Sequence, residues 1–449
     1  MYSPLGAISP LDGRYHNNVK EFHTYFSEAA LMQYRVYVEI EYLIALSQKK
    51  EVKKYLKIDQ KEYPQLRKIY QNFDLDCAEQ VKKIESETNH DVKAIEYYIQ
   101  KKTKKSLHPW IHFALTSEDI NNVSYSLMWK HALEQVYLPT LELMQKEIVS
   151  LVKKYHKTPM LSLTHGQPAT PTTFGKELSV FYKRIQKQTI KIKNHNLLGK
   201  LSGATGTWSA HNIAFSNINW PIFTSKFVSR LGLEPNLTTT QIESHDSIAE
   251  SYQNILRVNS ILKDLCQDMW LYISRGVISQ KKIKGEVGSS TMPHKINPIQ
   301  FENAEGNLGI SSALLNHMIQ KLPVSRMQRD LTDSTVLRNQ GVALGYSFIS
   351  IKSISKGISR ITLNKKKTEF ELNEHWEVLG EAIQTILRKE GKEDAYEKLK
   401  NLTRGETVDR VSIKLFIESL RLTQPHEEKL LSLSPKKYIG LALKIANRI

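Results

Sequence analysis

Long helical patterns dominate the arrangement of apolar and polar residues along this chain. Neither glycine nor proline occurs between Glu243 and Arg275. Within that segment, apolar residues recur at three- and four-residue steps or their multiples and mark one helix face: Ile248, Tyr252, Ile255, Leu262, Leu265, Met269 and Tyr272. Because an α-helix rises about 1.5 Å per residue, the segment predicts a helix approaching about 50 Å in length.

The same periodicity predicts two further long helices. One begins near Thr172 and has an apolar face formed by Phe174, Leu178, Phe181, Ile185 and Ile192. The other follows Pro139, with Thr140 as its expected N-cap and an inward face of Leu141, Met144, Ile148, Leu151 and Tyr155. No alternating strand pattern of useful length is visible. The pattern therefore predicts an all-α bundle whose long helices also bury surface against other subunits.

Two interruptions divide the 449 residues into three predicted helical domains, since a chain of this length exceeds one ordinary core. The segment His108-Pro109-Trp110 breaks the helical pattern after a basic run, and Asn364 precedes three lysines. We expect an N-terminal helical domain at 1–110, a central long-helix bundle at 111–364 and a C-terminal helical domain at 365–449.

Composition narrows the class of protein without naming a function. Hydrophobic residues make up 40% and charged residues 24%, which is typical of a globular protein, and no segment predicts a signal peptide or a membrane span. Cys77 and Cys266 lack a CxxC or Cys/His pattern, so we expect no disulfide framework, no metal site and a cytoplasmic location. The net charge of +17 comes from scattered lysines, which indicates no nucleic-acid partner but would attract a small anionic substrate.

The most informative polar segment is a loop expected at 285–298. It contains Gly288, two adjacent serines, a histidine and a lysine, and Pro293 and Pro298 prevent a regular helix through it. A Gly/Ser-rich stretch alone would predict a solvated linker. The whole string from 288 to 298, however, resembles the signature loop of the fumarase/aspartase superfamily, whose members eliminate fumarate or close analogues.

Four other polar segments have ordinary explanations when each is taken alone, such as a turn, a helix cap or a solvated corner. They lie at 12–15, 88–91, 116–119 and 164–171. Together with 239–243 and the arginine-containing segment 329–339, they extend the resemblance over essentially the whole chain. The combination resembles the adenylosuccinate lyase family in its bacterial form.

That resemblance implies a C–N lyase of purine nucleotide biosynthesis that works without a cofactor or metal. The implied reactions are β-eliminations of fumarate from adenylosuccinate, giving AMP, and from the succinylated aminoimidazole carboxamide ribotide (SAICAR), giving AICAR. Such chemistry needs a base for a carbon-bound proton, an acid for the departing nitrogen and fixed donors for the carbanion-like intermediate. The family also implies a homotetramer whose active sites are shared between subunits.

Site residues follow from the matching motifs. The resemblance implies Ser289 as the base and His165 as the general acid, a role that suits an imidazole with a pKa of about 6.5. His90 would orient the substrate, and phosphate contacts would come from Arg14, Tyr15, Ser334 and Arg338. The succinyl contacts implied are Thr116, Ser117, Gln241, Ser290, Lys295 and Asn303, and the remaining substrate-binding residues are Asn89, Asp91, Arg329 and Thr335.

Departures and alternatives remain. Residues 203–208 and Leu163 differ from the pattern common in close relatives, which affects substrate preference rather than chemistry. Another fumarate-releasing lyase is disfavoured by the arginines at 14, 329 and 338, because its substrate would carry no phosphate. A basic helical RNA-binding or scaffold protein would have no chemical need for Ser289, His165 and Lys295.

Overall fold

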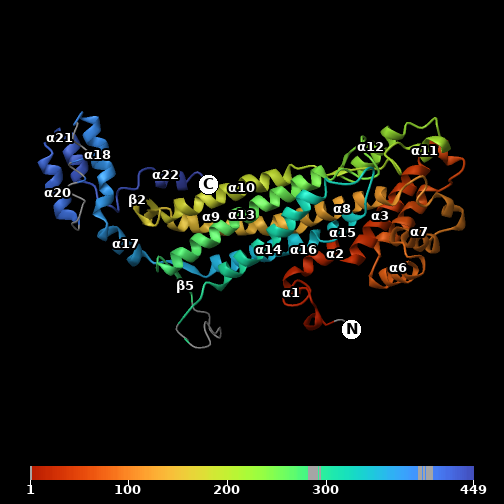
Figure 1. Ribbon diagram of the computed structural model, residues 1–449, viewed down its shortest axis with the longest axis horizontal. Coiled ribbons are helices and arrows are strands. Elements are labelled where there is room, and N and C mark those ends of the chain that lie inside the picture. The colour runs from red at the N-terminus through yellow and green to blue at the C-terminus, as the bar shows by residue number, and fades with distance from the viewer. Residues whose placement is uncertain (1–2, 282–291, 293–294, 393–396, 398–399, 401–407) are drawn as a thin grey trace. The chain divides into compact units, whose positions relative to one another are not determined.

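Helices make up most of the computed structural model, which describes residues 3–281, 292, 295–392, 397, 400 and 408–449 (Figure 1). The all-α prediction is confirmed in this mostly helical chain. Residue contacts divide it into two compact units. Unit 1 contains Met1–Leu141, Gln188–Ser260 and Gly306–Ile351, and unit 2 contains Glu142–Lys187, Ile261–Glu305 and Lys352–Ile449. The three-domain boundaries remain a prediction.

Five long helices each have residues in both units, and they are α9 (Leu138–Tyr155), α10 (Phe174–Lys193), α13 (Asp246–Ser274), α14 (Ile299–Lys321) and α16 (Gln340–Ser359). The 29 residues of α13 give it a length of roughly 44 Å. Its predicted apolar face is buried except at Tyr272, which is half-buried. The apolar face predicted for α10 is buried at all five positions. Hydrophobic periodicity therefore located both helices correctly.

The predicted N-cap at Thr140 is wrong. The chain passes without a break from α8 (Ser117–Ala132) through a π-helical turn, η5 (Leu133–Tyr137), into α9. Thr140 lies inside this continuous helix, and its hydroxyl donates a hydrogen bond to the carbonyl of Val136 at 2.9 Å. Pro139 has no N–H to contribute, and the π turn directly before it accommodates the interrupted hydrogen-bond ladder.

Three short two-stranded sheets occur among the described residues, although the sequence pattern predicted no strand. An antiparallel hairpin joins β1 (Pro159–Thr164) to β2 (Gln167–Thr173). β3 (Leu198–Gly199) is parallel to β4 (Glu234–Pro235), and β5 (Ile278–Gln280) is antiparallel to β6 (Ile361–Leu363). The strands β3 to β6 have two or three residues, too few for a recognisable alternation of apolar and polar positions, and along β1 and β2 buried and exposed positions do not alternate.

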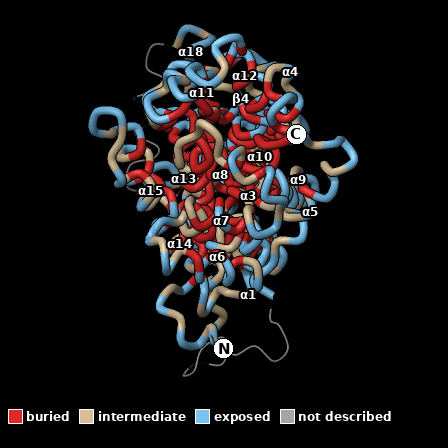
Figure 2. The backbone as a smooth tube through the Cα atoms, turned by 90° about the vertical axis from the view of Figure 1, so that its right-hand side faces the viewer, coloured by how far each residue is buried: buried red, intermediate tan, exposed pale blue. Residues whose placement is uncertain are grey.

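In unit 1, α3 (Glu28–Ser47) forms the centre of the packing and contacts α8, α5 (Tyr63–Gln71), α6 (Leu75–Thr88) and α7 (Asp91–Lys102). Figure 2 shows buried backbone concentrated along α3 and α8. The other helical segments of unit 1 are η1 (Pro4–Gly6), α1 (His16–Val19), η2 (Lys20–Phe22), α2 (His23–Phe26), α4 (Lys50–Lys53), η3 (Gln60–Glu62), η4 (Lys105–Trp110), α11 (Ser209–Ala214), α12 (Trp220–Arg230) and α15 (Thr332–Leu337).

In unit 2, a separate apolar cluster includes Leu379, Ile383, Leu387, Ile413 and Ile417. The helices that contribute to it are η6 (Trp376–Leu379), α18 (Gly380–Lys389), α20 (Arg410–Ser419) and α21 (Gln424–Leu431). Two other helices of this unit pack against the β1–β2 hairpin, with α17 (Lys365–Glu374) against β1 and α22 (Ala442–Ala446) against β2. No helix in the described part of the chain combines the length and apolar character needed to cross a membrane.

Candidate active site

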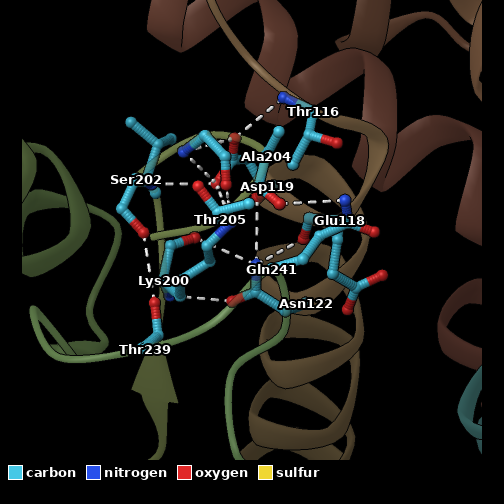
Figure 3. Close-up of polar contacts among 12 residues, drawn as sticks. Thr116, Glu118, Asp119, Asn122, Lys200, Ser202, Ala204, Thr205, Thr239 and Gln241 are labelled. Atoms are coloured by element: carbon cyan, nitrogen blue, oxygen red, sulfur yellow. Dashed lines mark hydrogen bonds and ion pairs between the residues drawn. The ribbon is translucent and has the colours of Figure 1, made fainter. Parts of the chain in front are cut away.

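A buried ion pair fixes the N-terminus of α8 (Figure 3). Lys200 Nζ lies 2.7 Å from Asp119 Oδ1, and both side chains are fully buried. The Asp119 carboxylate also accepts hydrogen bonds from the backbone amides of Thr116 and Ser202 at 2.9 Å and of Gly203 at 3.1 Å. These bonds compensate for the removal of the charges from water. They hold the predicted contacts Thr116 and Ser117 beside the loop 200–203.

The loop that follows Lys200 lies directly against the segment that carries Gln241. The hydroxyls of Ser202 and Thr239 are 3.2 Å apart, and Gln241 Nε2 donates to the carbonyl of Ala204 at 3.0 Å. Gly206 has φ of 78°, and a Cβ there would lie 2.0 Å from the carbonyl oxygen of Thr239. Only glycine allows the two backbone segments to approach this closely.

Arg329 joins this group from a third part of the sequence. Its Nη1 donates to Gln241 Oε1 at 3.3 Å, and its Nη2 lies 3.3 Å from Glu118 Oε2. Four predicted substrate contacts, Thr116, Ser117, Gln241 and Arg329, therefore come from one locally connected region of unit 1. Arginine and amide donors of this kind can bind carboxylate or phosphate oxygens.

A cavity of about 390 Å³ in unit 1 brings together two other predicted residues, Asp91 and Arg338. Arg35, which also lines it, donates through Nη2 to Asp91 Oδ2 at 2.7 Å and through Nε to Asn121 Oδ1 at 2.9 Å. Burial opposes ionisation of Asp91, but the Arg35 guanidinium holds the pKa of that carboxyl below its usual range. The cavity thus carries fixed charges of both signs and has room for a small polar ligand.

Asn89 and His90 form the turn between α6 and α7. Asn89 adopts the left-handed conformation at the end of α6, with φ of 50°. His90 is the N-cap of α7, and its Nδ1 accepts the amide of Lys93 at 3.2 Å. The histidine is exposed, and its Nε2 edge is not used by this cap. The turn places His90 directly before Asp91 and the cavity that Asp91 lines.

The predicted phosphate contacts lie at two places in unit 1. Ser334 is within α15, as is the predicted substrate-binding residue Thr335, and the exposed Arg338 is the C-cap of that helix. Arg14 is exposed and Tyr15 half-buried just before α1, and the Tyr15 amide donates to the carbonyl of Pro10 at 2.8 Å. Among these residues, Arg338 is the one that lines the cavity.

His165 lies at the tip of the β1–β2 hairpin in unit 2. His165 and Gly166 occupy the two turn positions, with φ of 54° and 73°, while Thr164 pairs with Gln167. Positive φ at both central residues is the pattern of a tight hairpin turn whose twist matches that of the strands. The turn leaves the imidazole exposed to an incoming group.

Unit 2 also contains Lys295 and Asn303. Lys295 is exposed, and its amide donates to the carbonyl of Met292 at 3.0 Å. Asn303 lies in α14, where its Oδ1 accepts the hydroxyl of Ser353 at 3.0 Å. The predicted base Ser289 and the predicted contact Ser290 lie outside the described residues.

Several residues of these regions were not predicted as site residues. Glu118, Asp119 and Asp333 belong to polar motifs that had been singled out, so a search for charged residues within those motifs would have found them. Arg35 and Lys200 lie in segments without any such motif. Their importance comes from tertiary ion pairs with Asp91 and Asp119, which local sequence does not indicate.

One group of described residues has the composition of a cation site. Ligand-type atoms of the buried Glu118, His245 and Asp333 all lie within 4.8 Å of one another. The Arg329 guanidinium, however, is 3.3 Å from Glu118 and 4.0 Å from Asp333. Because the Arg329 guanidinium already neutralises part of the carboxylate charge, the group fits a buried network of ion pairs better than a metal centre.

Comparison with protein families and curated proteins gives consistent matches along the chain. Residues 13–310 match the family model described as Lyase, and residues 325–439 match the model described as Adenylosuccinate lyase C-terminal. The adenylosuccinate lyase of Buchnera aphidicola subsp. Schizaphis graminum is 47% identical over 99% of both chains. That of Legionella pneumophila is 48% identical over 98% of both chains, and that of Escherichia coli is 45% identical over 100% of this chain and 99% of the relative.

Solved structures with much lower sequence identity share the fold. A fumarate lyase from a Mesorhizobium species superposes with a TM-score of 0.75 at 16% identity, covering 95% of this chain and 96% of that one. A 3-carboxy-cis,cis-muconate lactonizing enzyme from Pseudomonas putida gives a TM-score of 0.75 at 17% identity, covering 96% of both. The adenylosuccinate lyases are 45–48% identical to this chain over nearly its full length, so they establish the family as well as the fold. This chain belongs to the adenylosuccinate lyase family of fumarate-releasing lyases in purine biosynthesis.

Proposed function

We propose that this chain cleaves the C–N bond of adenylosuccinate to give AMP and fumarate, and of SAICAR to give AICAR and fumarate. The main support is the match to adenylosuccinate lyases over essentially the whole chain. The region of unit 1 that joins Thr116, Ser117, Gln241 and Arg329 supplies hydroxyl, amide and guanidinium donors, as a substrate rich in carboxylate and phosphate requires.

Ser289 acts in this proposal as the base that removes the proton from the carbon beside a carboxylate. The electron pair left on that carbon delocalises into the carboxylate and then forms the double bond of fumarate as the C–N bond breaks. Serine is a poor base unless its alkoxide is stabilised, so Lys295 and the amides of the loop that contains Ser289 must lower the free energy of that anion. Ser290 and Asn303 bind the succinyl portion.

His165 acts as the acid that protonates the departing nitrogen. A histidine carries a proton near neutrality, and the hairpin turn presents this one on the protein surface. His90 orients the substrate from its exposed position at the start of α7. The phosphate binds Arg14, Tyr15, Ser334 and Arg338, and the rest of the nucleotide binds near Asn89, Asp91, Arg329 and Thr335.

The proposed assembly is a cytoplasmic homotetramer with active sites shared between subunits. Each of four long helices exposes an apolar side chain to roughly half its full extent, namely Leu143 on α9, Ile190 on α10, Leu271 on α13 and Ile310 on α14. Burial of such side chains against other subunits would remove apolar surface from water. The exposed hairpin tip at His165 is available to a neighbouring subunit in the same arrangement. Both described cysteines are free thiols, which suits a reducing compartment.

Replacement of Ser289 tests the proposed chemistry. Ser289→Ala removes the base but leaves the proposed phosphate and carboxylate contacts, so adenylosuccinate should still bind while kcat falls by at least about a thousandfold. Calorimetric titration measures the binding, and a fumarate assay measures turnover. Ser419→Ala, at an exposed position of α20, is the matched control and should leave both unchanged. A Ser289→Ala enzyme that keeps a tenth of its activity would exclude Ser289 as the base.

Arg338→Lys tests the proposed phosphate site. Lysine keeps the positive charge but cannot offer two parallel donors to phosphate oxygens, so KM for adenylosuccinate should rise about tenfold with little change in kcat. Arg326→Lys is the matched control, because Arg326 lies just before the segment 329–339 and its side chain is 79% exposed. An unchanged KM for Arg338→Lys would remove this residue from the phosphate site.

Mixed subunits test the shared active site. His165→Ala and Ser289→Ala proteins, each inactive, should regain activity after mild unfolding and reassembly together, because some sites then combine an intact histidine with an intact serine from another chain. Random mixing restores about a quarter of the sites when two chains contribute. Mixing Ser289→Ala with the double variant cannot restore a site and is the control. Hybrids verified by mass spectrometry that stay inactive would contradict the shared arrangement.

A further inference from the structure

A group of buried charged side chains surrounds Arg329, which itself contacts Gln241. Glu118 of α8, His245 of the loop before α13 and Asp333 of α15 converge there, and each is at most 4% exposed. Each has a buried atom without a hydrogen-bond partner among the described residues: Glu118 Oε1, His245 Nε2 and Asp333 Oδ2. We call these three residues together with Arg329 the charged cluster.

Distances within the charged cluster are those of ion pairs. Arg329 Nη2 lies 3.3 Å from Glu118 Oε2, Arg329 Nε lies 4.0 Å from Asp333 Oδ2, and His245 Nε2 lies 3.8 Å from the same Asp333 oxygen. His245 adopts φ of 62°, a left-handed conformation that is unfavourable for a side chain with a Cβ. Its amide is held by Glu243 Oε2 at 2.8 Å. Strain of this kind persists where the surroundings require one position of the residue.

Charge balance decides between an ion-pair network and a bound cation. Two carboxylates carry two negative charges when ionised, and Arg329 supplies one positive charge. A single proton on His245 or Glu118 brings these four side chains to neutrality. The buried Glu243, whose Oε2 accepts the amide of His245, adds one further negative charge beside them, whereas the nearby Lys200 adds no net charge because Asp119 pairs with it. The Arg329 guanidinium already lies among the ligand-type atoms of Glu118 and Asp333 and would repel a divalent cation there, so a proton is the better counter-charge.

We propose that Glu118, His245 and Asp333 are positioning residues for the substrate site, and that they act by holding Arg329 in a charge-balanced cluster. Arg329 in turn donates to Gln241, and the Asp333 carboxylate accepts the amide of Ser334 at 2.6 Å. One network thus connects a succinyl contact, a nucleotide contact and the helix that carries two phosphate contacts. The inference rests on the proposed function, because it assumes that Gln241, Arg329 and Ser334 bind substrate.

The titration behaviour of the charged cluster agrees with one shared proton near neutrality. Burial raises the pKa of Glu118 to about 7, against the opposing effects of Arg329, His245 and Lys200. Burial alone would lower the pKa of His245, but Asp333, Glu118 and Glu243 raise it above its usual value. The proton then belongs to the Glu118–His245 pair rather than to either residue.

The test compares AMP binding by full-length His245→Gln, Glu118→Gln/His245→Gln and wild-type protein at pH 6.5 and 8.5. In His245→Gln only Glu118 can hold the proton, so rising pH leaves an uncompensated carboxylate. Its AMP affinity relative to wild type should fall by about tenfold more at pH 8.5 than at pH 6.5. In the double variant neither position 118 nor position 245 can exchange a proton, and Arg329 still lies beside Asp333, so its affinity relative to wild type should be the same at both pH values. His317→Gln, at an exposed position of α14, is the control.

The inference would be overturned if His245→Gln lost the same amount of AMP affinity, relative to wild type, at both pH values. It would also be overturned if the double variant lost AMP affinity with the same pH dependence as His245→Gln. So would a stoichiometric metal ion in purified wild-type protein by elemental analysis. If His245→Gln is too unstable for binding measurements, the midpoints of thermal unfolding of the two variants are compared. Charge balance predicts a higher midpoint for the double variant than for His245→Gln, and equal midpoints would contradict it. Wild-type protein that neither binds AMP nor cleaves adenylosuccinate would overturn the proposed function as well, whereas a normal wild type without the variant pattern overturns this inference alone.

Discussion

The arrangement of the proposed substrate contacts in unit 1 depends on the buried pair of Asp119 and Lys200. Removing both charges from water is unfavourable by several kcal/mol per ion unless hydrogen bonds compensate. Compensation is provided here by three backbone amides that donate to Asp119 and by the Gly203 carbonyl, which accepts from Lys200 Nζ at 2.6 Å. The pair thereby fixes the start of α8 against the loop that contacts Gln241. A change in either charge would disturb Thr116, Ser117 and Gln241 together.

Beyond that pair, the proposed site residues are held by polar contacts between segments that are distant in sequence. Arg329 connects Glu118 with Gln241, and Arg35 connects Asp91 with Asn121. Such contacts fix donor positions before a ligand arrives, which is how an elimination enzyme stabilises the charge that develops on a carboxylate. The proposed acid, His165, lies instead on an exposed two-residue turn, where it can contact groups from another chain.

Sequence periodicity was sufficient for the long helices because burial of one face is a local, repeating requirement. The face of α10 from Phe174 to Ile192 is buried at each predicted position. The sequence-based prediction was wrong at Thr140, because a π turn continues the helix through this residue although its local sequence resembles an N-cap. Four of the strands were missed because two or three residues contain no period, and β1 and β2 were missed because their buried and exposed positions do not alternate. Motifs led to the predictions for Gln241, Arg329 and Arg338, which remain predictions. Lys200 and Arg35 were not predicted, because they are defined by tertiary ion pairs with Asp119 and Asp91 that local sequence does not indicate.

The central claim is that this chain releases fumarate from adenylosuccinate, and product analysis tests it most directly. Purified protein would be incubated with adenylosuccinate at neutral pH under reducing conditions, and AMP and fumarate would be separated and quantified over time. Both products are expected to form in equal amounts, and their formation should stop when the substrate is exhausted or equilibrium is reached. Absence of both products from a folded, oligomeric preparation would contradict this activity.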